Sequence, residues 1–412
     1  MEHYIKEIYI DKLRHLSNIG IFLNSNQRQH LMITGKNGSG KTSLLIALQK
    51  YLQVINDKSL DDLIEQYIPK SVLIQKTLYE TISDTEKFKI KNDSYNAYII
   101  GQVKKYADGI RLVFSDYKEL ESMYMRGDFI TAYFPANRKT EIIRSQGVED
   151  IKLDDFYGID SAPGKLLHKY MVHLKTQQAY ARNEGDMSVV DRIQEWFDRF
   201  VNALRVLLDD ETITLEYDYK EYDFKIHEPG REPFGFDALS DGYSSVIHIV
   251  SDLIIRMDKN WLLSDGISRY DVEGIVLIDE LETHLHIELQ KKILPFLTEF
   301  FPRIQFIIST HSPYILNSIS NAKVYDLENG VELEDLSLYS SDSLAEGYFG
   351  ADEYSDKLKS KINRYKELKE KNNLSEREHA ERAKLRCELR NIPKGLSREA
   401  VEKFHDIEGS GL

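Results

Sequence analysis

Gly35-Lys36-Asn37-Gly38-Ser39-Gly40-Lys41-Thr42 is the stretch of the sequence that decides the fold. It matches the pattern G-x-x-x-x-G-K-[ST], in which glycines let successive backbone N–H groups turn inward around phosphate oxygens. The run His-Leu-Met-Ile-Thr at 30–34 predicts a strand before it, and the residues from Lys41 to about Val54 predict a helix after it. A strand, a glycine-rich loop and a helix in this order begin a parallel α/β unit whose helix N-terminus faces bound phosphate.

The loop itself predicts which groups hold a nucleotide. We expect Lys41 to reach the β- and γ-phosphates and the hydroxyl of Thr42 to ligate Mg²⁺. A chance glycine loop is disfavoured because the pattern and its strand-to-helix context agree. The nucleotide-binding residues predicted from this segment are Asn37, Gly38, Ser39, Gly40, Lys41, Thr42 and Ser43.

The second informative stretch is Ile275-Val276-Leu277-Ile278-Asp279-Glu280. Its apolar run predicts a strand that delivers Asp279 to the carboxyl edge of the sheet, where ligands bind in open α/β folds. Asp279 can hold Mg²⁺ there, and the adjacent Glu280 can polarise the attacking water. Four apolar residues before Asp-Glu are a weak signal alone, and the phosphate loop upstream makes them a strong one.

Two shorter segments gain meaning from their order along the chain. By itself, Leu239-Ser240-Asp241-Gly242 is typical of a turn that caps a helix. His311, in Ser309-Thr310-His311-Ser312-Pro313, directly follows a strand predicted at 305–309. A lone histidine is more often structural than catalytic, but one at a strand end next to the Asp-Glu pair can contact a γ-phosphate.

Taken in order, these segments resemble the ABC-type ATPase superfamily over roughly residues 1–330. In that superfamily two nucleotide domains dimerise head to tail, and the signature of one completes the site of the other. The resemblance implies that Ser240 and Gly242 act in trans on ATP bound by the partner. It further implies that His311 is the switch histidine and is catalytic together with Lys41 and Glu280.

The length of the segment between the phosphate loop and Asp279 indicates which branch of the superfamily the chain resembles. Lys41 and Asp279 are 238 positions apart, which exceeds what a compact transporter ATPase needs. The segment Pro135-Ala136-Asn137-Arg138 after a strand, together with the His311 segment, resembles OLD and RecF-like ATPases of bacterial defence and repair. No glutamine is evident at the usual Q-loop site, and no Asp-x-Asp cluster follows His311, so we expect the OLD nuclease domain to be missing. The whole chain resembles the ATPase subunit of Septu- or PARIS-type anti-phage systems, which act with a separate nuclease or effector.

The fold class expected from these patterns is α/β, with an ABC-type P-loop ATPase head built on a mixed sheet flanked by helices. An inserted, mostly helical lobe and a charged helical C-terminal tail complete it. Apolar residues at i, i+3/i+4 and i+7 predict a helix over 187–208 whose aromatic stripe packs in the core. A hairpin is predicted at 212–219 and 222–228, short strands at 97–100 and 110–114, and tail helices at 355–372 and 375–391. The predicted boundaries are 1–54, 129–139 and 212–335 for the head, 55–128 and 140–211 for the lobe, and 336–412 for the tail.

Composition excludes several classes of protein. The 412 residues carry 54 Lys and Arg against 68 Asp and Glu, a net charge of −14. A chain this acidic is no constitutive nucleic-acid coat, although a local contact with DNA or RNA stays open. Its single cysteine, Cys387, excludes a disulfide framework and a cysteine-based zinc site. No apolar run reaches the ~18 residues of a membrane helix, and the N-terminus lacks a signal-peptide pattern, so we expect a cytoplasmic protein without membrane contact.

The predicted function is hydrolysis of ATP to ADP and phosphate with Mg²⁺. The enzyme is expected to form a homodimer or a higher homo-oligomer and to regulate a separate effector, a nuclease, in anti-phage defence. A RecF-like DNA-binding repair ATPase and a slow-turnover nucleotide sensor remain alternatives at this stage. The long insert and the charged tail disfavour a transporter subunit.

Overall fold

The computed structural model describes residues 2–79, 83, 86, 88, 90, 93–138, 142–258, 272–347, 356–371, 373–390 and 398–409. The chain divides into two compact units, Met1–Leu338 and Tyr339–Leu412. Residues 139 and 140, where the predicted segments 129–139 and 140–211 meet, lie outside the described residues. So do residues 355, 372 and 391, at the ends of the predicted tail helices 355–372 and 375–391. The finer partition of the first unit into head and lobe stays a prediction.

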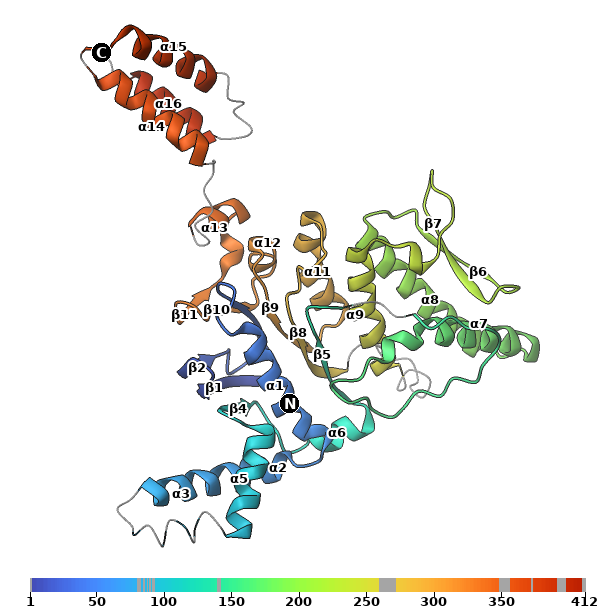
Figure 1. Ribbon diagram of the computed structural model, residues 1–412. Coiled ribbons are helices and arrows are strands. Elements are labelled where there is room, and N and C mark those ends of the chain that lie inside the picture. Colours follow the sequence, from blue (N-terminus) through green and yellow to red (C-terminus); the bar gives the residue numbers. More distant parts are fainter. Residues whose placement is uncertain are drawn as a thin grey trace. The chain divides into compact units, whose positions relative to one another are not determined.

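A six-stranded mixed sheet forms the centre of the first unit, in the order β11-β10-β3-β9-β8-β5 (Figure 1). Its strands pair in parallel except for β11, which pairs antiparallel with β10. Ile278 of β8 lies opposite both Phe134 of β5 and Ile308 of β9, so these three strands end at one edge. The strands are β3 (His30–Thr34), β5 (Phe129–Phe134), β8 (Glu273–Ile278), β9 (Ile304–Ser309), β10 (Ala322–Asp326) and β11 (Val331–Glu334).

The central strands are apolar without alternation because both faces of the sheet are covered. Every residue of β3, β8 and β9 is buried. Ile275 and Leu277 belong to the core shared with helix α1, whereas Val276 and Ile278 point to the opposite face and are equally buried. Continuous apolar runs of this kind are typical of parallel sheets between two layers of helices. The predicted α/β class is confirmed.

Helix α1 (Lys41–Asn56) packs between the main sheet and a second, three-stranded antiparallel sheet (Figure 1). That sheet has the order β2-β1-β4, and Ile8 of β1 lies opposite Ile21 of β2 and Leu112 of β4. Its strands are β1 (Ile5–Leu13), β2 (Leu16–Phe22) and β4 (Ile110–Phe114). The strand predicted at 110–114 is therefore confirmed, and it pairs with the N-terminal strand of the chain.

The strand predicted at 97–100 is wrong, because these residues lie within helix α5 (Ser94–Tyr106). Asp93 caps this helix by accepting a hydrogen bond from the Asn96 N–H at 2.9 Å. Ile99 and Tyr106 are buried seven positions apart on one face, which is helical spacing that a four-residue window could not reveal. The neighbouring elements are α2 (Leu60–Asp62), a π-helical turn at Leu63–Tyr67, α3 (Ile68–Tyr79) and α6 (Leu120–Arg126).

On the other side of the first unit, the predicted helix over 187–208 and the predicted hairpin are both confirmed. Helix α8 spans Met187–Leu208, and its aromatic stripe is core as predicted, with Trp196 stacked on Phe200 at a centroid distance of 5.5 Å. The predicted hairpin is formed by β6 (Thr214–Asp218) and β7 (Asp223–His227). Helix α9 packs on β5, and α11 packs on α8. These helices are α7 (Leu167–Glu184), α9 (Asp241–Met257), α11 (Ile287–Phe300) and α12 (Pro313–Leu316), with 3-10 turns at Pro163–Leu166, Phe236–Ala238 and Leu336–Leu338.

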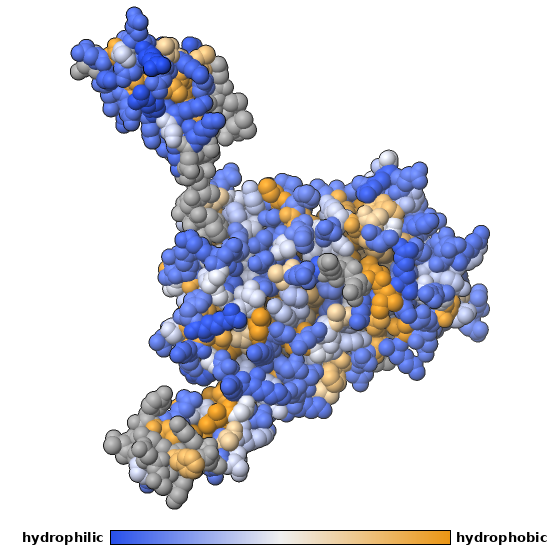
Figure 2. Space-filling model, in the orientation of Figure 1, coloured by the Kyte–Doolittle hydropathy of each residue, from blue (hydrophilic) through white to orange (hydrophobic). Residues whose placement is uncertain are grey.

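The second unit is helical and has a small core of its own. Its helices are α13 (Ser341–Gly347), α14 (Asp356–Glu370), α15 (Glu376–Arg390) and α16 (Arg398–Gly409). Ile362, Leu368, Leu389 and Phe404 bury their side chains against one another, so the third long helix, which was not predicted, completes a packed unit. Polar residues dominate the molecular face drawn in Figure 2, in keeping with a chain of which 30% is charged. None of the described helices is long and apolar enough to cross a lipid bilayer.

Candidate nucleotide-binding site

The phosphate loop joins β3 to α1 with a backbone that glycine alone adopts readily. Gly35, Gly38 and Gly40 have φ values of 129°, 84° and 104°. At Gly35 there is also no room for a side chain, because an added Cβ would lie 2.9 Å from the Ser39 Oγ and 3.2 Å from the Asp326 Oδ1. The glycines of the motif are therefore required by the turn itself.

The N-terminus of α1 leaves its backbone donors open to an anion. The helix begins at Lys41, and its N-cap is Gly40, which has no side chain to occupy the first N–H groups. The first turn of this helix, which the structure describes in full, contains no acidic residue. Free N–H groups and the positive end of the helix dipole together make an anion-binding site.

Lys41 lies folded over the loop that precedes it. Its Nζ donates hydrogen bonds to the backbone oxygens of Gly35 at 2.7 Å and Lys36 at 3.1 Å. Burial lowers the pKa of Lys41, and the carboxylates of Glu280, Glu282 and Asp279 oppose that shift. The site thus holds a largely buried ammonium group with carboxylates facing it.

A cavity of about 260 Å³ opens above the loop. Arg14 and His15, from the tight turn between β1 and β2, also line it, and the His15 Nε2 lies 3.0 Å from the Ser39 backbone oxygen. Neither residue was predicted, because a two-residue turn far upstream of the phosphate loop carries no pattern of its own. The lining residues from the predicted set are Asn37, Gly38, Gly40, Lys41, Thr42, Ser43 and Glu280.

Asp279 follows the last residue of β8 at the carboxyl edge of the sheet, as predicted, and is 2% exposed. The hydroxyl of Ser309, at the end of β9, donates to the Asp279 Oδ1 at 2.5 Å and accepts from the Glu280 N–H at 2.8 Å. Glu280 has a φ of 45°, so the chain turns sharply there. The sequence predicts no role for Ser309, because only the pairing of β8 with β9 brings it to Asp279.

His311 joins the same edge from the loop after β9. Its backbone N–H donates to the Glu282 Oε1 at 2.6 Å. Burial lowers the pKa of the His311 ring, and the positive charge of Lys41 lowers it further. The imidazole is therefore neutral near pH 7.

Polar atoms without partners gather at this edge. Among the described residues, four buried side-chain atoms here accept or donate no hydrogen bond: Thr34 Oγ1, Ser39 Oγ, Glu282 Oε2 and His311 Nε2. Buried polar groups are nearly always paired, so such a cluster indicates a place for a polar ligand. Hydroxyl and carboxylate oxygens suit Mg²⁺, and an ammonium with free N–H groups suits phosphate. The residues present thus fit a magnesium-bound nucleoside triphosphate.

The predicted signature residues lie apart from this cavity. Neither Ser240 nor Gly242 is among the described residues that line it. Ser240 is exposed at the N-cap of α9, and its side chain makes no capping hydrogen bond to the described residues. Gly242 is buried, and an added Cβ would lie only 2.6 Å from the His284 backbone oxygen. Within one chain, the start of α9 therefore packs on the loop after Glu280.

Comparison with known proteins shows the family of the chain. A family model described as "AAA domain, putative AbiEii toxin, Type IV TA system" matches residues 87–317, more than half of the chain. Septu protein PtuA of Bacillus mycoides (strain KBAB4) is 24% identical over 345 residues, which cover 81% of this chain and 42% of that protein. The Retron Vc95 probable ATPase of Vibrio cholerae serotype O1 biovar El Tor is 30% identical over 247 residues, covering 57% of this chain and 44% of the relative. The chain thus spans less than half the length of these relatives. The predicted resemblance to Septu ATPases is confirmed.

Among solved structures, the SMC head bound to the C-winged helix domain of ScpA is similar with a TM-score of 0.39 at 12% identity. The match covers 82% of this chain and 100% of that one.

Proposed function

The chain belongs to the family described as "AAA domain, putative AbiEii toxin, Type IV TA system", and on that premise we propose that it is an ATPase of an anti-phage defence system. In this proposal it binds and hydrolyses ATP, assembles head to tail with further copies of itself, and regulates a separate effector, a nuclease. The similarity to a Septu protein and a retron ATPase supports the defence role. A cytoplasmic location is part of the same proposal.

One observation carries the enzymatic part of the proposal: the polar groups that converge on the carboxyl edge of the sheet. Lys41 reaches this edge from the phosphate loop, Asp279 and Glu280 from the end of β8, and His311 from the loop after β9. The four unpartnered buried atoms beside them support a ligand with many oxygen acceptors and a bound cation.

We assign roles to these groups from their positions. ATP supplies the phosphoanhydride bond, and Mg²⁺ supplies charge that neutralises the phosphates. Lys41 and the N–H groups at the start of α1 bind the phosphates, while Thr42 and Asp279 hold the cation. Glu280 lines the cavity and accepts a proton from the attacking water. The His311 ring donates from Nε2–H to a phosphate oxygen.

The assembly part of the proposal depends on α9. Ser240 is an exposed hydroxyl before a 17-residue helix and makes no capping hydrogen bond to the described residues, so its hydroxyl can donate to a phosphate from outside the chain, beside Asp241 of the first turn. Phosphate bound by one copy can therefore contact the α9 terminus of the next copy. ATP then stabilises the assembly, because this contact exists only across the interface.

The test is a mixing experiment with two inactive variants and phosphate release as the readout. Ser240→Arg is preferable to a substitution at Gly242, because a side chain at 242 collides with His284 within the same chain. Lys41→Ala and Ser240→Arg should each be inactive alone. Mixed, they should regain only partial activity, since one composite site has both residues intact if the two sites need not fire together. Hydrolysis by strictly monomeric wild-type chain, at a rate per chain independent of concentration, would contradict the assembly.

The effector part is tested by the neighbouring genes. A small nuclease gene beside this one, required together with it to reduce phage plaque counts, supports the proposal. A permease gene in that place would contradict it.

A further inference from the structure

Arg138 is a buried cation that the proposed chemistry leaves unused. It lies four residues after the end of β5 and is only 5% exposed. Burial lowers its pKa to about 10, while the carboxylates of Glu282, Asp279 and Glu280 oppose the shift, so the guanidinium remains charged at neutral pH. A buried charge is retained only where its hydrogen bonds are satisfied.

Its first set of partners is the turn that carries Glu280. Arg138 Nη1 donates to the Asp279 backbone oxygen at 2.6 Å, and Nη2 donates to the Glu280 oxygen at 3.0 Å, with the Leu281 oxygen at 3.5 Å. The turn needs such support because the φ of Glu280 is 45°, a conformation that non-glycine residues avoid. The planar guanidinium therefore holds three successive carbonyl groups of a strained turn in place.

Its second partner lies on helix α9. The Arg138 Nε donates to the hydroxyl of Ser245 at 3.1 Å, and Ser245 lies in the second turn of the helix that starts beside Ser240. The same end of α9 touches the catalytic loop once more, where Gly242 packs against the His284 backbone oxygen. One side chain thus joins the start of α9 to the Glu280 turn.

The far end of α9 is tied to β5. Arg256 donates to Asp252 one turn earlier at 2.5 Å and to the Thr131 backbone oxygen of β5 at 3.0 Å. Figure 1 shows α9 beside β5, the strand that Arg138 follows by four residues. Hydrogen bonds of Arg138 and Arg256 thus hold α9 near both of its ends.

We propose that Arg138 is a positioning residue that couples the start of α9 to Glu280. A phosphate contact made at Ser240 by a neighbouring copy then sets the position of Glu280 within the same chain. ATP bound in one composite site thereby changes the position of Glu280 in the other, and hydrolysis becomes cooperative in ATP. This inference rests on the proposed head-to-tail ATPase and adds to it a route between the two sites.

Two variants separate the two functions of the side chain. Arg138→Lys keeps the charge and loses the planar fork, and we expect kcat to fall roughly 10- to 100-fold with less than about a two-fold change in ATP affinity. Ser245→Ala leaves the three carbonyl bonds intact and removes only the link to α9. Its ATP dependence should be hyperbolic where that of the wild type is sigmoidal, with kcat at saturation changed less than in Arg138→Lys.

The readouts are ATP affinity by calorimetry, phosphate release against ATP concentration, and the melting temperature of the full chain. If both variants lower only the melting temperature and keep wild-type kinetics at a temperature where they are folded, Arg138 is merely structural and the inference is overturned. Hyperbolic kinetics in the wild type would also overturn it. Absence of any wild-type hydrolysis is a different result, because it contradicts the proposed ATPase itself.

Discussion

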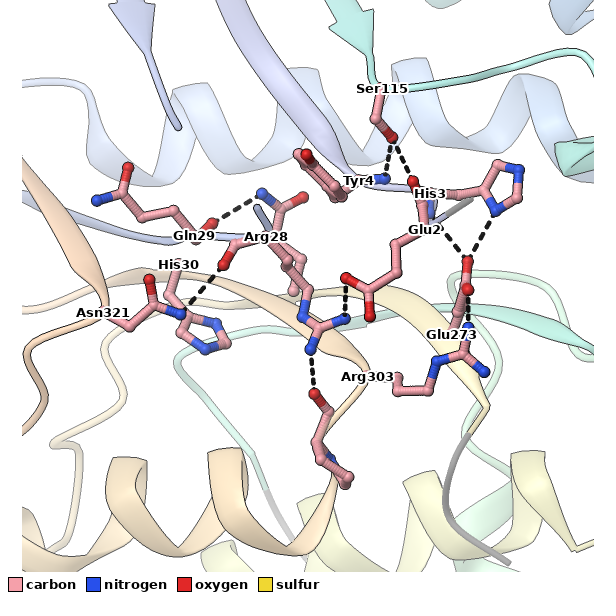
Figure 3. Close-up of polar contacts among 12 residues, drawn as sticks. Glu2, His3, Tyr4, Arg28, Gln29, His30, Ser115, Glu273, Arg303 and Asn321 are labelled. Carbon is pink, nitrogen blue, oxygen red and sulfur yellow. Dashed lines mark hydrogen bonds and ion pairs between the residues drawn. The ribbon is translucent and has the colours of Figure 1, made fainter. Parts of the chain in front are cut away.

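Buried polar groups are hydrogen-bonded at the amino edge of the central sheet, whereas several lack partners at its carboxyl edge. At the carboxyl edge, four buried polar atoms lack partners among the described residues, and Glu280 holds a left-handed backbone conformation. At the amino edge, Glu273 at the start of β8 is 3% exposed and accepts hydrogen bonds from the His3 backbone N–H at 3.0 Å and the His3 Nδ1 at 2.8 Å, and also pairs with Arg303 (Figure 3). The start of β8 thus carries a carboxylate whose hydrogen bonds are satisfied, whereas the loop after its end carries Glu282, whose Oε2 lacks a partner among the described residues.

The amino edge is built to hold two sheets together. The buried amide of Gln305 in β9 accepts from the Ile5 N–H at 2.8 Å and donates to the oxygens of Ile5 and Gln29, both at 2.9 Å. Figure 3 shows Glu2, His3 and Tyr4 of the N-terminal segment converging on this edge with Arg28 and Glu273. The comparison shows that buried polar groups with hydrogen-bond partners stabilise the amino edge, and that those without partners indicate a ligand site at the carboxyl edge.

The largest expected effect tests whether the carboxyl edge binds the nucleotide, and it comes from removing the positive charge of Lys41 there. Lys41→Ala should weaken ATP binding by roughly 100-fold or more, because it deletes a buried ammonium that faces phosphate. Calorimetric titration with ATP and Mg²⁺ measures this. The matched control is Glu273→Gln, which should leave ATP affinity unchanged and lower the free energy of unfolding by about 1–3 kcal/mol. Unchanged ATP affinity in Lys41→Ala would remove the nucleotide site from this edge.

Glu280→Gln separates binding from chemistry at the same edge. The amide keeps the shape of the side chain but cannot accept a proton from water, so kcat should fall by roughly 100-fold or more while ATP still binds. Phosphate release under saturating ATP, with binding measured in parallel, checks both halves. Wild-type turnover in this variant would exclude Glu280 as the base and direct attention to His311.

At the amino edge, the expected effect is on the pH dependence of the free energy of unfolding and not on ATPase activity. Burial, together with the charge of Arg28, lowers the pKa of His30 from 6.5 to about 4, and its Nδ1 accepts from the Phe306 N–H at 3.1 Å. The unfolded chain binds the proton at higher pH than the folded chain. The stabilisation is therefore complete above pH ~6.5 and declines as pH falls towards ~4, by up to about 3 kcal/mol.

Denaturant unfolding of the wild type and of His30→Asn across this pH range measures that effect. Asparagine retains an acceptor near the position of Nδ1 and does not titrate, so the difference between the two proteins should shrink as pH falls. A difference that is constant from pH 7 to pH 4 would show that His30 titrates normally in the folded chain.

The smallest expected effect concerns the hydroxyl that joins two strand ends at the carboxyl edge. Ser309→Ala removes the donor to Asp279 and the acceptor for the Glu280 N–H, so kcat should fall about 10-fold and the Mg²⁺ concentration needed for half activity should rise. A magnesium titration of phosphate release tests this. Equal magnesium dependence in both proteins would mean that Asp279 needs no orientation by Ser309.

The sequence by itself determined the elements whose cause is local. Three glycines in eight residues, a lysine and a threonine predict the phosphate loop, because the φ angles and the helix start are set within that stretch. The apolar run before Asp279 predicts a buried strand, and 22 residues of helical periodicity predict α8 to the residue. The short helix α5 was mistaken for a strand because four residues hold too little periodicity to decide.

Only the tertiary structure decided which distant residues meet at the site. Ser309 reaches Asp279, 30 positions away, because β8 and β9 pair in register, and Arg138 reaches the Glu280 turn because β5 lies on the other side of β8. Arg14 and His15 enter the cavity through a turn of a different sheet. Strand order and register arise from packing over the whole core, which no local pattern encodes, and therefore the partners of the Glu280 turn emerge only when the sheet is assembled.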